Sequence, residues 1–159
     1  MREFCGYGLP SPSLAPAFAS AVCDVLGHGT QGGAVIMLLE TAAQETHLGR
    51  YRDPTPNGAG RGLCQCDPIG FHDVIARARD VDLYAVQKYF GFDLRSTEHC
   101  QLDASPLLSF LVCRLFYKLI PEPFPIHLPG RAAYWKKYYN TRAGKGTVGE
   151  YIENVKRFC

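Results

Sequence analysis

Residues 41–49 read TAAQETHLG, and residues 60–65 read GRGLCQ. The first stretch closes a segment whose apolar residues recur at helical spacing, so we expect a helix that is capped by Thr30 and ends at about Gly49. The second stretch follows DPTPNGAG at residues 53–60, which is dense in turn formers and favours a small hairpin. A long non-helical insertion directly after a helix is typical of the lining of a cleft.

The remaining sequence predicts a mainly α fold. Apolar periodicity and turn residues predict helices at 13–26, 71–81, 82–91, 107–120 and 147–159. Capping signals support three of these helix starts: Asp82, Ser105 followed by Pro106, and the pair Thr147 and Glu150. The segment 107–120 is apolar nearly all round, which is typical of a buried central helix.

Length and composition favour one domain. The chain has 159 residues, of which 47% are hydrophobic, and this is enough to close a single core. No apolar run approaches the roughly 18 residues of a membrane-spanning helix, so we expect no membrane span. We therefore predict a single helical domain over residues 1–159, with a loop or hairpin insertion that lines a cleft.

Charge is distributed unevenly along the chain. The net charge is +2, but the last 29 residues carry +5 and the first 130 carry −3. The basic part includes the predicted C-terminal helix, residues 147–159, and the aromatic run around Tyr138. Such a region suits nucleic acid or another anionic polymer, although a solvated helix face is the simpler explanation.

The seven cysteines do not follow the spacing of a metal site. No Cys-x-x-Cys pair occurs, and Cys64-x-Cys66 has no matching second pair, so a zinc site would need His72 or His99 to complete it. We therefore predict no metal and no organic cofactor. An odd number of cysteines at irregular spacing favours mostly reduced thiols.

Glu45 is the strongest candidate for chemistry. It falls in the last turn of the predicted helix, where the partial negative charge of the helix end disfavours a carboxylate. This position, with partial burial under the following loop, is expected to raise its pKa. A carboxylic acid that stays protonated near neutral pH is what a general acid requires. Gln65 adds an amide that both donates and accepts hydrogen bonds, which suits sugar hydroxyl and N-acetyl groups.

The motif Gln44-Glu45-Thr46, followed about twenty residues later by Gly62-Leu63-Cys64-Gln65, resembles the soluble lytic transglycosylase family and its goose-type lysozyme relatives. In that family a helix ends in Glu-Ser, and a later loop carries Gly-Leu-Met-Gln. A third family element, Ala-Tyr-Asn, is similar to Tyr138-Tyr139-Asn140. The resemblance covers roughly residues 30–145 and implies a lysozyme-like α+β fold.

The resemblance also implies roles for individual residues. It implies that Glu45 is catalytic and that the substrate is the MurNAc–GlcNAc strand of peptidoglycan. It implies substrate-binding roles for Thr46, Gly62, Leu63, Gln65, Tyr139 and Asn140. Two features depart from the family pattern, because cysteine replaces the methionine of the second motif and the loop between the motifs is slightly longer.

The stretch Tyr134–Thr147 is similar to phage-encoded muralytic proteins. The first residues, Met1–Gly6, lack the basic-then-apolar layout of a cleaved secretion signal. We therefore expect a protein that is made in the host cytoplasm without a signal peptide and acts on the bacterial cell wall. It is expected to be a virion component, with other virion proteins as partners, or a lysis protein.

The number of carboxylates bears on the mechanism. A hydrolytic glycosidase normally needs two carboxyl groups. Asp53 is the first candidate for the second group and Asp67 another, while Glu40 is a rival to Glu45 on a different side of the helix. The resemblance implies instead that one glutamate acts as acid and then as base, with the muramyl 6-hydroxyl as a tethered nucleophile.

Two other classes of function stay open. A non-enzymatic phage structural or DNA-contacting protein would use the basic, aromatic C-terminal region. A Cys/His cell-wall peptidase would pair Cys64 with His47, His72 or His99. Against the peptidase, Cys64 lies in a glycine-rich loop and does not open a helix, where its thiolate would be stabilised.

Overall fold

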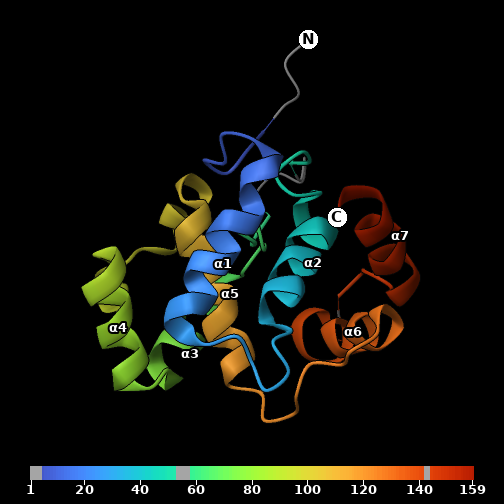
Figure 1. The fold of residues 1–159 in the computed structure, drawn as a ribbon. Coiled ribbons are helices and arrows are strands. Elements are labelled where there is room, and N and C mark those ends of the chain that lie inside the picture. Colours follow the sequence, from blue (N-terminus) through green and yellow to red (C-terminus); the bar gives the residue numbers. More distant parts are fainter. Residues whose placement is uncertain (1–4, 53–57, 142–143) are drawn as a thin grey trace.

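The computed structural model describes residues 5–52, 58–141 and 144–159, and these form a mainly helical structure (Figure 1). This confirms the predicted mainly α class. The α-helices are α1 (Ala15–Leu26), α2 (Ala34–Thr46), α3 (Pro68–Arg77), α4 (Asp80–Phe90), α5 (Pro106–Lys118), α6 (Leu128–Trp135) and α7 (Val148–Phe158). Short 3₁₀ turns lie at Pro12–Leu14, Leu94–Ser96 and His99–Ala104, and one π-helical turn lies at Lys136–Asn140.

Helix α5 is the buried centre of the fold, as its apolar sequence predicts. Ten of its 13 residues are buried, and it packs against α1, α2 and α3. Helices α3 and α4 lie on one side of α1 and α5, whereas α6 and α7 lie beyond α2 on the other side (Figure 1). Helix α2 is therefore the element that joins the central part of the core to the C-terminal helices.

Two of the predicted helix starts are confirmed. The Ser105 hydroxyl accepts a hydrogen bond from the Leu108 backbone N–H at 3.1 Å, with Pro106 in the first turn of α5. At α7, Thr147 and Glu150 form the reciprocal bonds of a capping box. These signals are local, so the sequence alone is enough to identify them.

Two other helix starts were wrong. Helix α2 begins at Ala34 without a side-chain cap, because the glycines at 29 and 32 adopt positive φ and form a turn that contains Thr30. Helix α4 begins at Asp80 instead of Asp82. Asp82 is buried in the first turn and pairs with Lys118 of α5 at 2.9 Å, a tertiary contact that the local pattern does not contain.

The insertion between α2 and α3 contains little regular secondary structure among the described residues. Arg61 and Cys66 form an isolated antiparallel bridge, and within the described residues the chain forms no longer strand. Asn57, where a turn is predicted, lies outside the described residues, and so does Asp53. None of the helices in the described ranges is both long enough and apolar enough to cross a bilayer.

Candidate functional site

Glu45 lies in the last turn of α2, as predicted. The helix ends because His47, Leu48 and Gly49 all adopt left-handed backbone conformations. The N–H groups of His47 and Leu48 donate back to carbonyls of the last turn, at Ala43 and Ala42. This sharp end places Glu45 one residue before Thr46, the last residue of α2.

The side chain of Glu45 is partly buried against α6. Its Oε1 accepts a hydrogen bond of 3.1 Å from Nε1 of Trp135, which is itself fully buried. Burial raises the pKa of Glu45 to about 7, while the bond from Trp135 opposes this rise. The expected rise in pKa is thus present, and removal from water is its main cause.

The second carboxyl oxygen of Glu45 makes no hydrogen bond to the described residues. Trp135 is its hydrogen-bond partner among the described residues, and this bond uses Oε1. In the described part of the chain, no fully buried side-chain oxygen lacks a partner, so Oε2 must reach the surface. Glu45 therefore combines a raised pKa with an accessible oxygen, which is the state required of a general acid near neutral pH.

The loop of the second motif is a tight turn closed by the Arg61 and Cys66 bridge. Gly62 has a φ of 76°, and a Cβ at this position would lie 2.8 Å from the Ser109 hydroxyl. Only glycine fits there, for both conformational and steric reasons. Leu63 is fully buried, so it anchors the loop in the core, and its contact with substrate stays a prediction.

The side chains of Asp103 and Ser109 hold this loop in place by hydrogen bonds. Asp103 accepts from the Gly62 N–H and from the Arg61 guanidinium, each at 2.8 Å. Ser109 accepts from the Cys64 N–H at 3.2 Å. Neither residue can be identified from the sequence, because both lie more than 40 residues away and no local pattern marks them.

Thr46 connects the end of α2 to the loop. Its hydroxyl donates to the Leu63 carbonyl at 2.8 Å and accepts from the Gly49 N–H at 3.2 Å. The residue is fully buried. Its role in this structure is therefore to fix the position of the two motifs, and direct contact with substrate stays a prediction.

Tyr139 joins the third motif to the same place. Its hydroxyl donates to the Cys64 carbonyl at 2.6 Å. Burial raises its pKa well above the usual range, and the charge of Glu45 adds to this rise. The three sequence motifs thus meet in space, through Thr46 to Leu63 and Tyr139 to Cys64.

Gln65 and Asn140 have their polar groups engaged nearby. Gln65 adopts a positive φ of 50°, and its amide donates to the Gly62 carbonyl at 2.9 Å and to the Tyr7 hydroxyl at 3.3 Å. Asn140 accepts from the Lys136 ammonium at 2.6 Å. Both residues stabilise their own loops, and their contacts with a glycan remain predictions.

The other carboxylates near the site are paired. Glu40 is buried, with Arg131 at 2.7 Å and the Tyr151 hydroxyl at 2.9 Å. Asp67 caps α3 through the Gly70 N–H at 2.6 Å. Glu40 therefore serves a structural network and is a poor alternative to Glu45, while Asp53 lies outside the described residues.

The cysteine alternative gains no support from the geometry. Cys64 is a buried residue of the loop, and no contact among the described residues joins it to a histidine. His47 stacks on Phe158 with ring centroids 4.4 Å apart, and His99 bonds to the Cys66 carbonyl at 2.6 Å. The histidines thus have other partners, and a thiol–imidazole pair is not assembled.

Part of the basic charge of the C-terminal region is used inside the fold. Arg131 is bound to Glu40, and the Lys136 ammonium donates to Asn140 and to the carbonyls of Gly144 and Gly146. Arg131 thus ties α6 to α2 and Lys136 fixes the turn after α6, so neither cation is free to bind a polyanion. This reduces the case for a nucleic-acid contact that the charge count alone suggests.

Trp135 is the partner of Glu45 that the sequence did not reveal. It lies 90 residues further along the chain, and its indole N–H is the donor at the carboxyl group. A single tryptophan in an aromatic run is a weak signal, which fits core packing as well as stacking on bases or sugars. Comparisons of the chain with protein-family models, with curated proteins and with solved structures found no match.

Proposed function

We propose that this protein cleaves the glycan strands of peptidoglycan as a lytic transglycosylase, with Glu45 as the catalytic acid and base. The observation that carries the proposal is a carboxyl group of raised pKa with one oxygen free, at the place where the three motifs meet. A groove that admits the glycan beside Glu45 is part of this proposal.

The proposed reaction needs a single carboxyl group. Protonated Glu45 donates its proton to the oxygen of the MurNAc–GlcNAc bond, which breaks with the bonding electrons moving to that oxygen. The resulting carboxylate then accepts the proton of the muramyl 6-hydroxyl, and this oxygen bonds to the anomeric carbon to close an anhydro ring. Because the nucleophile is tethered to the sugar, no second carboxylate has to position a water molecule.

The surrounding residues support this use of Glu45. Trp135 orients one carboxyl oxygen, and the buried side of the site disfavours the ionised form before the reaction starts. Once the proton has left, the indole N–H stabilises the carboxylate. The rigid links through Thr46 and Tyr139 keep the loop of residues 62–65 at a constant position beside the acid.

Digestion of purified peptidoglycan, followed by mass spectrometry of the products, tests the proposal. The native protein is expected to yield anhydromuramyl ends, each lighter by one water than a reducing end. Glu45→Gln is expected to lower the rate by about 100-fold or more, the usual contribution of a positioned acid. Unchanged cleavage by a folded Glu45→Gln variant would refute the assignment.

Asp53→Asn serves as the matched control for a second carboxylate. We expect this variant to retain most of the activity and to give the same anhydro product. Loss of activity in Asp53→Asn, together with reducing ends from the native protein, would show a two-carboxylate hydrolase instead.

A further inference from the structure

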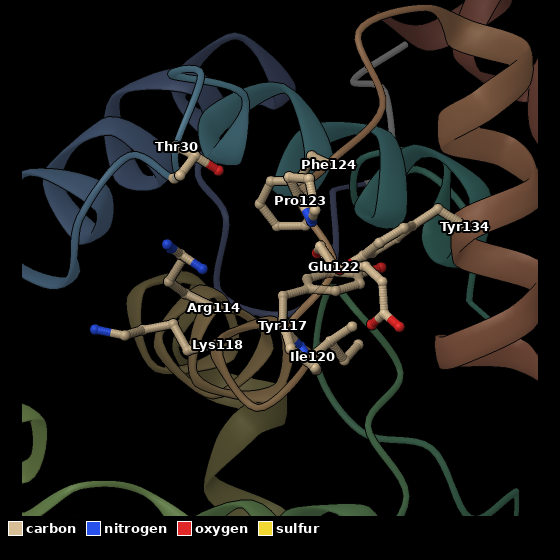
Figure 2. A pocket seen from close by; sticks show the side chains of 11 residues that line it. Thr30, Arg114, Tyr117, Lys118, Ile120, Glu122, Pro123, Phe124 and Tyr134 are labelled. Carbon is tan, nitrogen blue, oxygen red and sulfur yellow. The ribbon is translucent and has the colours of Figure 1, made fainter.

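A separate pocket lies between the C-terminal half of α5 and the proline-rich connector that follows it. The pocket has a volume of about 190 Å³ and is lined on one side by Arg114 and Thr30. Phe124 and Tyr134 line the other side, as Figure 2 shows. It does not include Glu45 or the loop of residues 62–65, so the proposed reaction makes no use of it.

Arg114 is the unusual residue of this pocket. The residue is only 5% exposed, although it carries a guanidinium group. Its Nε donates to the Gly27 carbonyl at 2.9 Å, and its Cζ lies 5.8 Å from the centre of the Phe124 ring. No carboxylate among the described residues forms an ion pair with it, so a nearly buried cation is left without a counter-ion.

The free N–H groups of Arg114 face the pocket. Its two terminal nitrogens donate to none of the described residues, and no fully buried side-chain nitrogen in the described part of the chain lacks a partner. These nitrogens are therefore not fully enclosed, and Arg114 lines the pocket. A buried charge with unmade hydrogen bonds is costly, and the cost falls when an anion with two acceptor oxygens binds.

The other charged groups of the pocket are accounted for. Lys118 donates to Asp82 at 2.9 Å and to the Leu26 carbonyl at 3.0 Å. The carboxylate of Glu122 points away from the Arg114 guanidinium (Figure 2). The pocket thus presents one unpaired positive charge and also holds a negative group, which suits a monoanion better than a dianion such as phosphate.

The remaining wall is aromatic. The rings of Phe124 and Tyr134 lie 5.4 Å apart, and Tyr117 lies 5.4 Å from Phe124. Gly29 and Gly33 bring the backbone against Phe124, because a Cβ at either position would lie 3.5–3.6 Å from its ring or its Cβ. The position of Phe124 is therefore well fixed, and the wall favours an organic group over an inorganic ion.

From these observations we propose that this pocket binds a small organic carboxylate, with the two terminal nitrogens of Arg114 holding its oxygens and Phe124 and Tyr134 holding its apolar part. Both the carboxyl end of a peptide and a free small acid have this chemistry. The stem peptides of peptidoglycan carry such ends, but the binding site stands independently of the function proposed for Glu45.

Titration of the full chain, followed by NMR of its backbone amides, tests this site with four probes. N-acetyl-alanyl-alanine and propionate represent the peptide end and the free acid, and the peptide amide and inorganic phosphate are the controls. We expect at least one carboxylate to shift the amides of residues 29–33 and 117–124, and to bind at least tenfold more tightly than the amide or phosphate. The tighter carboxylate identifies the source.

Two substitutions on the same helix sharpen the test. Arg114→Met is expected to abolish binding, whereas Lys118→Met, which removes a cation already paired with Asp82, retains it. Glu45→Gln is expected to bind like the native chain, so failure of the two proposals can be told apart. Equal binding of the amide or phosphate, or no binding by any probe, would show that Arg114 only caps α1. These probe comparisons need no variant, so they decide the question even if Arg114→Met does not fold.

Discussion

At the scale of single residues, the protonation of Glu45 sets the pH dependence of the proposed reaction. Its pKa of about 7 means that the acid form predominates below neutral pH and is lost above it. We expect the cleavage rate to be level at pH 5–6 and to fall about tenfold per pH unit well above 7. Initial rates on purified peptidoglycan across this range measure the limb. A rate that rises through pH 7–9 would contradict the role of Glu45 as an acid.

The Trp135 N–H is expected to influence the pH at which the cleavage rate falls. It stabilises the ionised form of Glu45, so its removal in Trp135→Phe is expected to raise the pKa and move the falling limb to higher pH. The level rate at low pH should change less than the position of the limb. Tyr84→Phe is the control, since it removes a hydroxyl from an exposed ring of α4 that does not bond to Glu45. If the rate of Trp135→Phe falls at the same pH as that of the native protein, the tryptophan has a packing role only.

The raised pKa of Glu45 also predicts a cost in stability. The folded pKa, about 7, exceeds the ordinary value of 4.5, so the folded state holds the proton more tightly than the unfolded chain does. Stability is therefore lost as pH rises from 4.5 to 7, by about 3 kcal/mol in full. Glu45→Gln escapes this loss, so its free energy of unfolding should exceed the native value at pH 8 and match it near pH 4. Urea denaturation at the two pH values measures the difference. Equal stabilities at pH 8 would contradict the burial of the carboxyl group.

At the scale of elements, Thr46 couples the end of α2 to the loop of residues 62–65. Thr46→Val keeps the shape of the side chain but leaves the Leu63 carbonyl and the Gly49 N–H without their partner. We expect a loss of about 1–3 kcal/mol in the free energy of unfolding, with cleavage reduced because the loop moves relative to Glu45. Thr46→Ser retains the hydroxyl and should stay close to the native protein in both measurements. A native-like Thr46→Val would show that the loop is held by Asp103 and Ser109 alone.

The helices show what could be predicted from sequence and what could not. The starts at Ser105 and Thr147 were predicted because the side chain that caps each helix lies within three residues of its partner. The start at Asp82 was wrong because α4 begins two residues earlier, and the Asp82 carboxylate binds Lys118, 36 residues away, as well as its near neighbour Arg79. Local chemistry is visible in a single sequence, whereas a competing tertiary partner is not.

The candidate site also has one part that the sequence predicts and another that only the structure shows. Glu45 at a helix end, the glycine-rich turn and the order of the motifs are sequence properties, and the structure brings the three motifs together. The donor from Trp135 and the support from Asp103 depend on contacts over 90 and 41 residues. No periodicity or capping rule connects positions so far apart, so only the fold reveals them.

At the scale of the whole molecule, the pair of Glu40 and Arg131 holds α2 against the C-terminal helices. The guanidinium binds both oxygens of the carboxylate, the Tyr151 hydroxyl of α7 donates to the same group, and both charges are nearly buried. Helix α2 also carries Glu45, and α6 carries Trp135, so this network fixes the distance between the acid and its donor. Its role is therefore to preserve the geometry of the site from a position outside it.

Arg131→Met should leave the Glu40 carboxylate buried without a counter-ion. We expect the free energy of unfolding to fall by about 3–5 kcal/mol, and much of this loss to be recovered in the double variant Glu40→Gln with Arg131→Met, because the uncompensated charge is then gone. Lys145→Met removes an exposed cation of the same basic region and should change stability by less than about 0.5 kcal/mol. Denaturant unfolding of these proteins, together with the single variant Glu40→Gln, measures the coupling. If the double variant is no more stable than Arg131→Met, then the loss comes from packing around the arginine stem and not from the charge of Glu40.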